Sequence, residues 1–407
     1  MKRLIIYTVN LLLLITAGSI SAQEYPTGML FDDEQYSEID QKATLTRSLY
    51  NNIPKKHSLK KYAPQVKSQG SYGTCVGWAS AYAALTIAEA IQAKRNKPEE
   101  ITAEAFSPGF VYTQIKFASD NNCTYGSHIH DALELMKTKG AAKYNALAEV
   151  NCPAYISENV FNQASEHTIE DYAKLFGLFD SNSFKLSSTK KSLSQNNPVI
   201  IGMNVPRSFY TAKEVWTPNE PATGKYYGHA MCVVGYDDDL HGGVFEVMNS
   251  WGSGWGNSGY IYIKYKDYAD FVKYAYEISA LPDKDNIIKL AGSIRLQSSE
   301  GFEYPVKKVG HGYQTQKDIK AGSAFRIYIK NPEPAYVYAF GFDKTEKVFP
   351  IFPHKPKVSP YLSYSTNEVA LPDEQHFIQA DETLGKNYIC ILLSKKPIDI
   401  NSVYKTI

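Results

Sequence analysis

The order of helical and strand patterns along residues 53–282 is the feature that most limits the fold of this chain. Apolar side chains recur at helical spacing over residues 75–93 and 130–139, and Gly140 suits the end of the second helix. The pattern then changes to short runs rich in Val, Ile and Tyr, which predict strands. These strands are expected at residues 198–203, 230–236, 243–249 and 259–265. Helices first and strands afterwards predict an α+β domain with separate halves.

The C-terminal part of the chain, residues 288–407, carries strand patterns only. Residues 324–330 alternate apolar and polar side chains, a Pro-containing turn follows, and residues 336–340 and 388–393 continue the pattern. Residues 281–285 have the composition of a linker. We therefore expect a second domain that is all-β and sandwich-like.

Residues 1–22 have the order of a secretory signal peptide. Lys2 and Arg3 precede an apolar stretch, and several small residues end the segment. An uncleaved membrane anchor is the alternative. Asn10 interrupts the apolar stretch, however, and the small residues suit cleavage better than a span of about 20 apolar residues. Cleavage after Ala22 predicts a secreted or periplasmic protein with no membrane span afterwards.

Residues 23–52 are polar and locally acidic, and they show neither a helical nor a strand period. They are too few to form a domain, so we interpret them as an N-terminal extension or a short pro-segment. The sequence leaves open whether this segment inhibits the domain that follows.

The charge and cysteine content exclude some classes of protein and partner. Lys and Arg number 43 against 42 Asp and Glu, so the formal charge of +1 offers no field that would attract nucleic acid. Charged residues at 21% together with aromatic residues at 13% argue against a disordered chain. Five Cys residues cannot all pair within one chain, although export would permit disulfides.

Cys75 is the first residue whose surroundings indicate chemistry. It ends a loop that contains Gly70 and Gly73, and it stands where the predicted helix begins. A helix N-terminus favours negative charge and so stabilises a thiolate, while the glycines let backbone amides approach a bound carbonyl. Taken alone, such a Cys could equally be a small core residue.

His229 and Asn249 complete the candidate set. His229 follows Gly228 and opens an apolar strand, and Asn249 ends a strand before the Trp-Gly-rich residues 250–260. Taken alone, the first reads as a structural histidine and the second as a tight turn. Together with Cys75 they supply a nucleophile, a base and a group that orients the base, in that order along the chain.

With these segments the chain resembles the papain-like cysteine peptidases over residues 53–282. The motifs that carry the resemblance are residues 69–75, 228–236 and 249–260. The resemblance implies a two-lobed fold, one lobe helical and one β-rich, with the active cleft between them. It also implies hydrolysis of a peptide or protein substrate through a thioacyl-enzyme, with neither cofactor nor metal.

The resemblance assigns a role to each matching residue. It implies that Cys75 is the nucleophile, that His229 is the general base and acid, and that these two rest as a thiolate–imidazolium pair. Asn249 would orient the imidazole, and Gln69 would hold the oxyanion together with the backbone N–H of Cys75. The residues expected to line the substrate or shield the site are Gly73, Gly126, Gly228 and Trp251.

Several positions depart from the family pattern. Tyr72 stands where the family has a Cys, Val76 where it has an aromatic residue, and Tyr125 where it has a Gly. The separations from Cys75 to the His and the Asn also exceed the roughly 130–150 residues that are typical. These changes put the subsite geometry in doubt but remove no catalytic group. They motivate the alternative of a catalytically silent binding or adhesion protein on the same scaffold.

The other Cys residues and the C-terminal domain complete the expectations. The resemblance implies a disulfide between Cys123 and Cys152, whereas Cys232 and Cys390 read as free core thiols. His128 and His130 stand alone without a zinc motif, so metal binding there is not expected. Residues 288–407 look similar to β-sandwich modules of bacterial exported proteins, which suggests a surface or polymer ligand.

Overall fold

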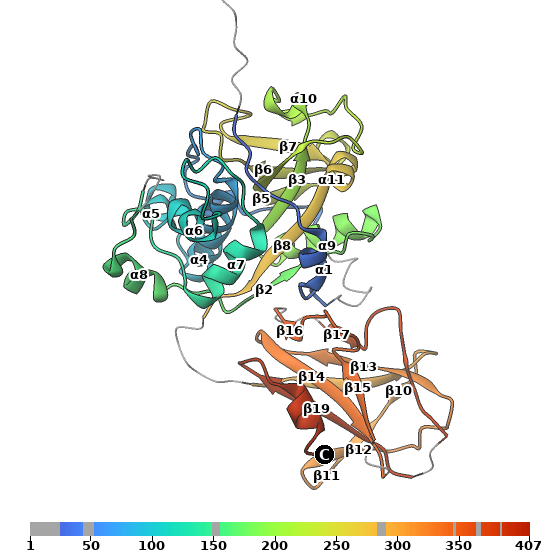
Figure 1. Ribbon diagram of the computed structural model, residues 1–407. Helices are drawn as coiled ribbons and strands as arrows, with labels where there is room; N and C mark the ends of the chain where they lie inside the picture. The colour runs from blue at the N-terminus through green and yellow to red at the C-terminus, as the bar shows by residue number, and fades with distance from the viewer. Residues whose placement is uncertain are drawn as a thin grey trace, which may run out of the picture.

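The computed structural model contains two bodies, an α+β domain and a β domain (Figure 1). It describes residues 25–43, 53–148, 155–282, 290–344, 347–363, 368–382 and 385–407. The predicted signal peptide and its cleavage site at Ala22 lie outside these residues. Within them, no helix is long and apolar enough to cross a membrane.

A buried helix that begins at Cys75 runs through the helical half. Its first turn is α3 (Cys75–Gly77), its middle is the π-helical segment η2 (Trp78–Leu85), and it ends as α4 (Thr86–Gln92). The sequence predicted a regular helix here. The middle departs from it where every side chain is buried, so packing against neighbouring elements sets the local winding.

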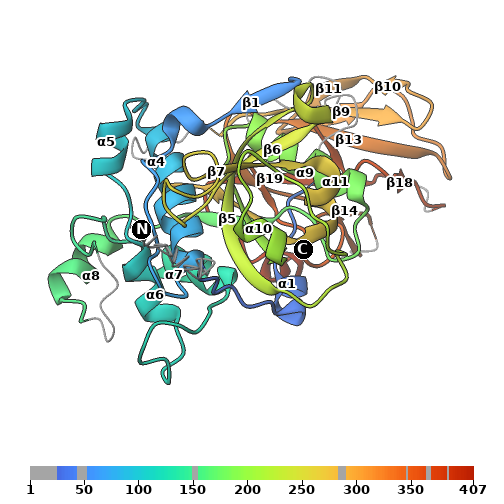
Figure 2. The ribbon, with the colours of Figure 1, turned by 90° about the horizontal axis from the view of Figure 1, so that it is seen from above.

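The other helices of this half pack around that buried helix (Figure 2). The sequence correctly predicted α7 (Ile129–Thr138), and Gly140 follows it with a φ of +81°, which Gly adopts readily. The remaining helices of this half are α5 (Pro98–Ala103), α6 (Pro108–Ile115) and α8 (Glu158–Ser165).

An eight-stranded sheet forms the second half of the α+β domain. Its strands are β1 (Lys56–Ser58), β2 (Asp171–Lys174), β3 (Val199–Val205), β4 (Val215–Trp216), β5 (Tyr227–Asp237), β6 (Val244–Met248), β7 (Tyr260–Lys264) and β8 (Val272–Ala280). They follow the order β2-β8-β3-β5-β6-β7-β4, with β1 also paired to β5. The four strands predicted in this region correspond to β3, β5, β6 and β7. Three helices flank the sheet, namely α9 (Asn182–Ser194), α10 (Arg207–Tyr210) and α11 (Tyr265–Phe271).

The N-terminal extension contains a helix that the sequence pattern did not reveal. This helix, α1 (Asp33–Glu38), has only six residues, too few to establish a period. Asp32 caps it by accepting a hydrogen bond from the backbone N–H of Gln35. Tyr36 is buried and stacks on Tyr274 of β8 at a centroid distance of 4.1 Å. Tertiary packing therefore fixes this helix against the sheet.

The C-terminal domain is all-β except for its last helix, as predicted. One sheet follows the order β10-β9-β13-β17 with β18 on β13, and a second follows β15-β14-β16 with β19 on β14. Apolar side chains from both sheets share one core. The elements are β9 (Ser293–Ser298), β10 (Glu303–Tyr304), β11 (Val306–Val309), β12 (Gly312–Thr315), β13 (Ala324–Lys330), β14 (Ala335–Phe342), β15 (Val348–Phe352), β16 (Tyr361–Leu362), β17 (Glu368–Leu371), β18 (Ile378–Gln379), β19 (Tyr388–Ser394) and α12 (Ile400–Tyr404).

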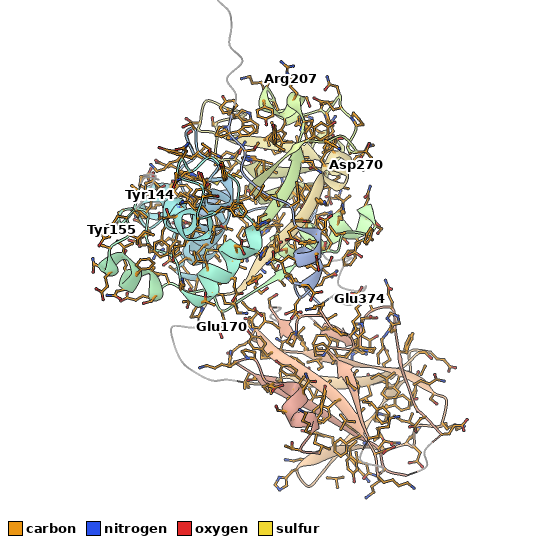
Figure 3. The ribbon with its side chains drawn as sticks, viewed as in Figure 1. Tyr144, Tyr155, Glu170, Arg207, Asp270 and Glu374 are labelled. Carbon is orange, nitrogen blue, oxygen red and sulfur yellow. The ribbon has the colours of Figure 1, made fainter. Side chains whose placement is uncertain are left out.

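Residues 38–43 join the two domains. The backbone N–H of Gln41 donates to the carbonyl of Lys357 at 2.8 Å, and Glu38 forms an ion pair with the Lys357 side chain at 2.9 Å. On the other side, Lys42 forms a buried ion pair with Glu277 of β8 at 2.6 Å. Figure 3 shows the facing surfaces of the domains, which the labels of Glu170 and Glu374 mark. The N-terminal extension is thus held by both domains.

Candidate active site

Cys75 lies where the buried helix meets the central strand of the sheet. Its Sγ accepts a hydrogen bond from the backbone N–H of Ala230 in β5 at 3.4 Å. The side chain is fully buried at the N-terminus of α3, as the sequence predicted. The helix start and the strand together fix the sulfur at the junction of the two lobes.

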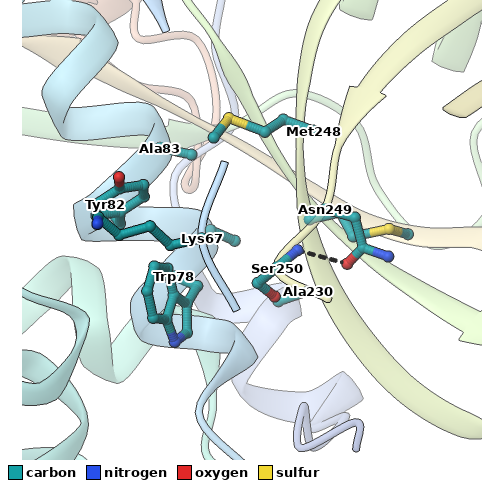
Figure 4. Close-up of a pocket in the computed structure, with 10 residues that line it drawn as sticks. Lys67, Trp78, Tyr82, Ala83, Ala230, Met248, Asn249 and Ser250 are labelled. Carbon is teal, nitrogen blue, oxygen red and sulfur yellow. Dashed lines mark hydrogen bonds between the residues drawn. The ribbon is translucent and has the colours of Figure 1, made fainter. Parts of the chain in front are cut away.

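His229 and Asn249 lie next to each other on neighbouring strands. His229 is in β5, Asn249 directly follows β6, and His229 Nε2 is 2.8 Å from Asn249 Oδ1. The same Oδ1 accepts a hydrogen bond from the backbone N–H of Ser250 at 2.7 Å, drawn as a dashed line in Figure 4. Because an amide oxygen only accepts, Nε2 carries the ring proton and Nδ1 keeps its lone pair. Nδ1 is buried and has no hydrogen-bond partner among the described residues.

Trp251 covers this histidine. Its ring stacks on the imidazole of His229 at a centroid distance of 4.6 Å. Gln69 is held close by, since its Oε1 accepts from the Ser250 hydroxyl at 2.6 Å and its backbone N–H donates to the Ser250 carbonyl at 2.8 Å. The structure thus gathers these predicted residues from three separate segments of the chain.

A stretch of the N-terminal extension, residues 25–31, crosses this site, and we call it the strap. Figure 1 shows it in blue between the helices and the sheet, leading to α1. Met29 donates its backbone N–H to the carbonyl of Gly228 at 3.1 Å. On the opposite wall, Ser127 donates to the carbonyl of Gly28 at 2.9 Å and accepts from the N–H of Leu30 at 3.0 Å. The strap is therefore an extended peptide bonded to both lobes.

The three glycines predicted to line the substrate lie directly against the strap. A Cβ at Gly228 would lie 2.3 Å from the Met29 carbonyl oxygen, and one at Gly126 would lie 2.8 Å from that of Gly28. Gly28 itself has a φ of +140°, and a Cβ there would lie 2.3 Å from the carbonyl oxygen of Gly73. Backbone packs on backbone at all three positions, which only Gly permits.

Trp251 and Gln69 also contact the strap. The Trp251 Nε1 donates to the carbonyl of Pro26 at 2.8 Å, and its ring stacks on Tyr25 at 4.9 Å. Gln69 Nε2 donates to the carbonyl of Thr27 at 3.4 Å. Sequence reasoning missed the strap, because an extended segment held by main-chain bonds needs no recognisable side-chain pattern.

Burial shifts the pKa of both the Cys and the His. It raises the pKa of the Cys75 thiol to about 12, although the bond from Ala230 opposes this. It lowers the pKa of His229 to about 4, against the effect of the Asn249 hydrogen bond. Burial thus disfavours the charged forms of both groups, which is opposite to the direction that a thiolate–imidazolium pair requires.

A small cavity lies next to Asn249 and Ser250 (Figure 4). It separates the buried helix from β5 and β6, and Trp78 forms part of its wall. The Trp nearest to Cys75 in sequence thus faces this cavity. The lining side chains are Lys67, Trp78, Ala79, Tyr82, Ala83, Ala230, Met231, Met248, Asn249 and Ser250.

The remaining Cys residues differ in burial. Cys232 is a free, buried thiol in β5, as predicted. Cys390 is also free, but it is only partly buried, because no residue of β19 is fully covered by the rest of the domain. Cys123 is buried and is not among the free thiols. Cys152 lies outside the described residues, so the pairing of Cys123 with Cys152 stays a prediction.

Cys75, His229 and Asn249 lie at the junction of the helical and strand-rich lobes, and they are the residue types that a thiol nucleophile, its base and an orienting group require. Comparison with known proteins identifies the family. The model of the papain family of cysteine proteases matches residues 53–279, and the chain belongs to this family. A second match, over residues 318–397, is to a domain of unknown function (DUF4384).

The similar proteins cover the chain only in part. An uncharacterized peptidase C1-like protein of Acanthamoeba polyphaga mimivirus is 29% identical over 217 residues, which are 50% of this chain and 65% of that protein. A cathepsin L-like protein of Caenorhabditis elegans is 36% identical over 76 residues, 18% of this chain and 23% of that protein. The chain thus spans less than two thirds of the length of these relatives.

Among solved structures, xylellain, a cysteine protease from Xylella fastidiosa, has the same fold. It superposes with a TM-score of 0.50 at 22% identity and covers 62% of this chain and 94% of its own. The predicted two-lobed papain-like fold is thereby confirmed.

Proposed function

We propose that the protein is an exported cysteine peptidase that hydrolyses peptide bonds through a thioacyl-enzyme on Cys75. One observation carries the proposal. The cleft that contains Cys75, His229 and Asn249 holds an extended peptide, the strap, by main-chain hydrogen bonds from both walls. A surface that binds the extended backbone of the strap in this way can bind the extended backbone of a peptide substrate.

The geometry supports a role for each residue in the reaction. Nδ1 of His229 has the free lone pair, so it takes the thiol proton of Cys75. The resulting thiolate then attacks the substrate carbonyl. The developing oxyanion accepts bonds from Gln69 Nε2 and from the N–H of Cys75. The role of Gln69 Nε2 as a donor is supported by the hydrogen bond that it already makes to the carbonyl of Thr27.

The second half of the reaction returns the enzyme to its starting state. His229 donates its proton to the departing amine, and the acyl group remains as a thioester on Cys75. A water molecule, deprotonated by the same ring nitrogen, then attacks the thioester and releases the acid. Asn249 keeps the ring in place throughout, while Trp251 excludes water from the Nε2–Oδ1 bond.

The strap makes the described state a latent one in this proposal. It occupies the positions of Gly73, Gly126 and Gly228 that a substrate would need, so it must leave before substrate binds. Its departure would admit water, and the thiolate–imidazolium pair would then be favoured. Gly28→Val is a direct way to displace it, since no side chain fits against the Gly73 carbonyl.

The wider assignments belong to the same proposal. The order of residues 1–22 supports export, with residues 23–52 as the extension, 53–282 as the peptidase domain and 288–407 as the accessory domain. A surface or polymer ligand is proposed for the accessory domain. The near-zero net charge gives no support for nucleic acid as a partner.

Labelling with a thiol-directed peptidyl inhibitor tests the proposal. Under reducing conditions at mildly acidic to neutral pH, Gly28→Val should be labelled at Cys75, wild type more slowly, and Cys75→Ala not at all. Absence of labelling in Gly28→Val, with its fold verified by circular dichroism, would refute the peptidase. That result would favour the alternative of a silent binding protein on the papain scaffold.

A further inference from the structure

A cluster of side chains that could bind a metal ion lies in the C-terminal domain, away from the proposed catalytic residues. It consists of His354, Asp373 and His376. His354 follows β15, and the other two are in the loop after β17. One potential ligand atom from each residue lies within 4.8 Å of those of the other two. The cluster joins two loops that are separated in sequence by β16 and β17, so no short sequence motif predicts it.

His354 and Asp373 lie at ion-pair distance without a hydrogen bond between them. His354 Nε2 lies 3.2 Å from Asp373 Oδ2, yet it makes no hydrogen bond with that oxygen. Zinc–ligand bonds of about 2.0–2.1 Å at tetrahedral angles place neighbouring ligand atoms about 3.3 Å apart. The observed separation of His354 Nε2 and Asp373 Oδ2 matches that spacing.

His376 is positioned to complete the set. Its Nδ1 is 2.7 Å from Asp373 Oδ2, a distance that a small rotation of the ring would open to ligand spacing. Its side chain is 64% exposed, so the ring has room to turn when a cation replaces the hydrogen bonds of Nδ1 to the two Asp373 oxygens at 2.9 and 2.7 Å. By contrast, the side chains of Asp373 and His354 are each more than four-fifths buried. One mobile ligand and two fixed ones form a site that a cation can enter from solvent.

The loop that carries Asp373 and His376 is held rigidly. The Oδ1 of Asp373 accepts the backbone N–H groups of Gln375 and His376, each at 2.7 Å. Arg326 of β13 donates to the carbonyls of Glu374 and His376 at 2.7 and 2.8 Å. Such outer contacts orient ligands in metal sites and raise affinity. The loop is therefore ordered before any ion binds, and only the His376 ring has to turn.

We propose that His354, Asp373 and His376 form a binding site for a divalent cation of the Zn²⁺ type. Two imidazoles and one carboxylate are donors that Zn²⁺, Co²⁺ and Ni²⁺ prefer, whereas Ca²⁺ and Mg²⁺ take oxygen ligands. Three protein ligands leave a fourth position for water or for a ligand of the accessory domain. The site is independent of the proposed peptidase chemistry and shares no residue with it.

Calorimetric titration tests the site. The protein is the full mature chain without a histidine tag, stripped with chelator, and it carries Cys75→Ala so that the catalytic thiol cannot bind the ion. We expect one equivalent of Zn²⁺ to bind, and Co²⁺ in its place to give the visible absorption of a tetrahedral centre. Asp373→Asn and His376→Ala should each weaken Zn²⁺ binding at least about tenfold.

A matched control separates this site from adventitious binding. His311→Ala removes an exposed histidine of the same domain that lies outside the cluster, and it should leave the affinity unchanged. The proposal is overturned if no ion binds, if Asp373→Asn and His376→Ala bind as tightly as the parent, or if His311→Ala weakens binding equally. Because His376 is largely exposed, its variant should fold, which circular dichroism verifies.

Discussion

The two histidine clusters of this chain differ in the residue that accompanies the imidazole. In the cleft, His229 is oriented by the neutral amide of Asn249 and is fully buried. In the C-terminal domain, His354 and His376 flank the carboxylate of Asp373 and are partly solvated. A neutral acceptor fixes a ring without adding charge, so Nδ1 can act as a base. A carboxylate adds the negative charge that a cation needs.

The largest effect is expected from removing a member of the buried cluster. His229→Ala should lower kcat/KM for a peptide substrate by at least about 10⁴-fold, as loss of a catalytic base does in related chemistry. Cys232→Ala, which removes a buried free thiol elsewhere in β5, serves as the control. Comparable losses of kcat/KM in both variants would mean that disruption of β5, rather than loss of the imidazole, lowers the activity.

Gln69→Ala should have the next largest effect, about 10²–10³-fold on kcat, because one oxyanion donor is lost. Gln69→Glu keeps the size of the side chain but places negative charge near the oxyanion, so it should be at least as harmful. Steady-state kinetics in the Gly28→Val background would measure both. A loss confined to KM would contradict the assigned role, since an oxyanion donor acts on the transition state.

Displacing the strap should raise activity rather than lower it. Gly28→Val should be labelled roughly 10–100-fold faster than wild type, if strap closure is worth about 1.4–2.7 kcal/mol. Gly301→Val is the matched control, since Gly301 also has a positive φ but no neighbour within 4 Å of its Cβ position. Equal labelling of wild type and Gly28→Val would show that the strap does not restrict access.

The pH dependence of labelling should show a smaller effect. Burial lowers the pKa of His229 from its ordinary value of 6.5 to about 4. In the proposed latent state the strap contributes to this burial, so protonation of His229 favours the uncovered state. Closure should therefore weaken as the pH falls below about 6.5. The ratio of labelling rates, Gly28→Val over wild type, should be several-fold smaller at pH 5 than at pH 7. A constant ratio would contradict the link between closure and a neutral imidazole.

The features that the sequence predicted correctly are those with a local signature. Cys75 at a helix start and His229 in an apolar strand are visible in the chain because glycines and apolar runs surround them. The position of the strap depended on main-chain bonds to Ser127 and Gly228, which leave no trace in side-chain type. Likewise, the π-helical turns of η2 arise from packing.

The second cluster escaped sequence reasoning for a different reason. His354 and Asp373 are brought together by the pairing of strands in a β domain, and such pairing is a property of the whole sheet rather than of any short segment. The pKa shifts of Cys75 and His229 also could not be predicted from the sequence. Burial raises the pKa of Cys75 and lowers that of His229, and this burial exists only in the folded chain.

The covalent attachment of the strap has a consequence for how latency responds to concentration. The strap continues into α1, which the ion pair of Asp33 with Lys273 at 2.8 Å and the stacking of Tyr36 hold against β8. A short tether of this kind corresponds to an effective concentration in the millimolar range. Dilution of the protein would leave the cleft covered, and a free peptide of residues 25–31 would compete only at millimolar concentrations.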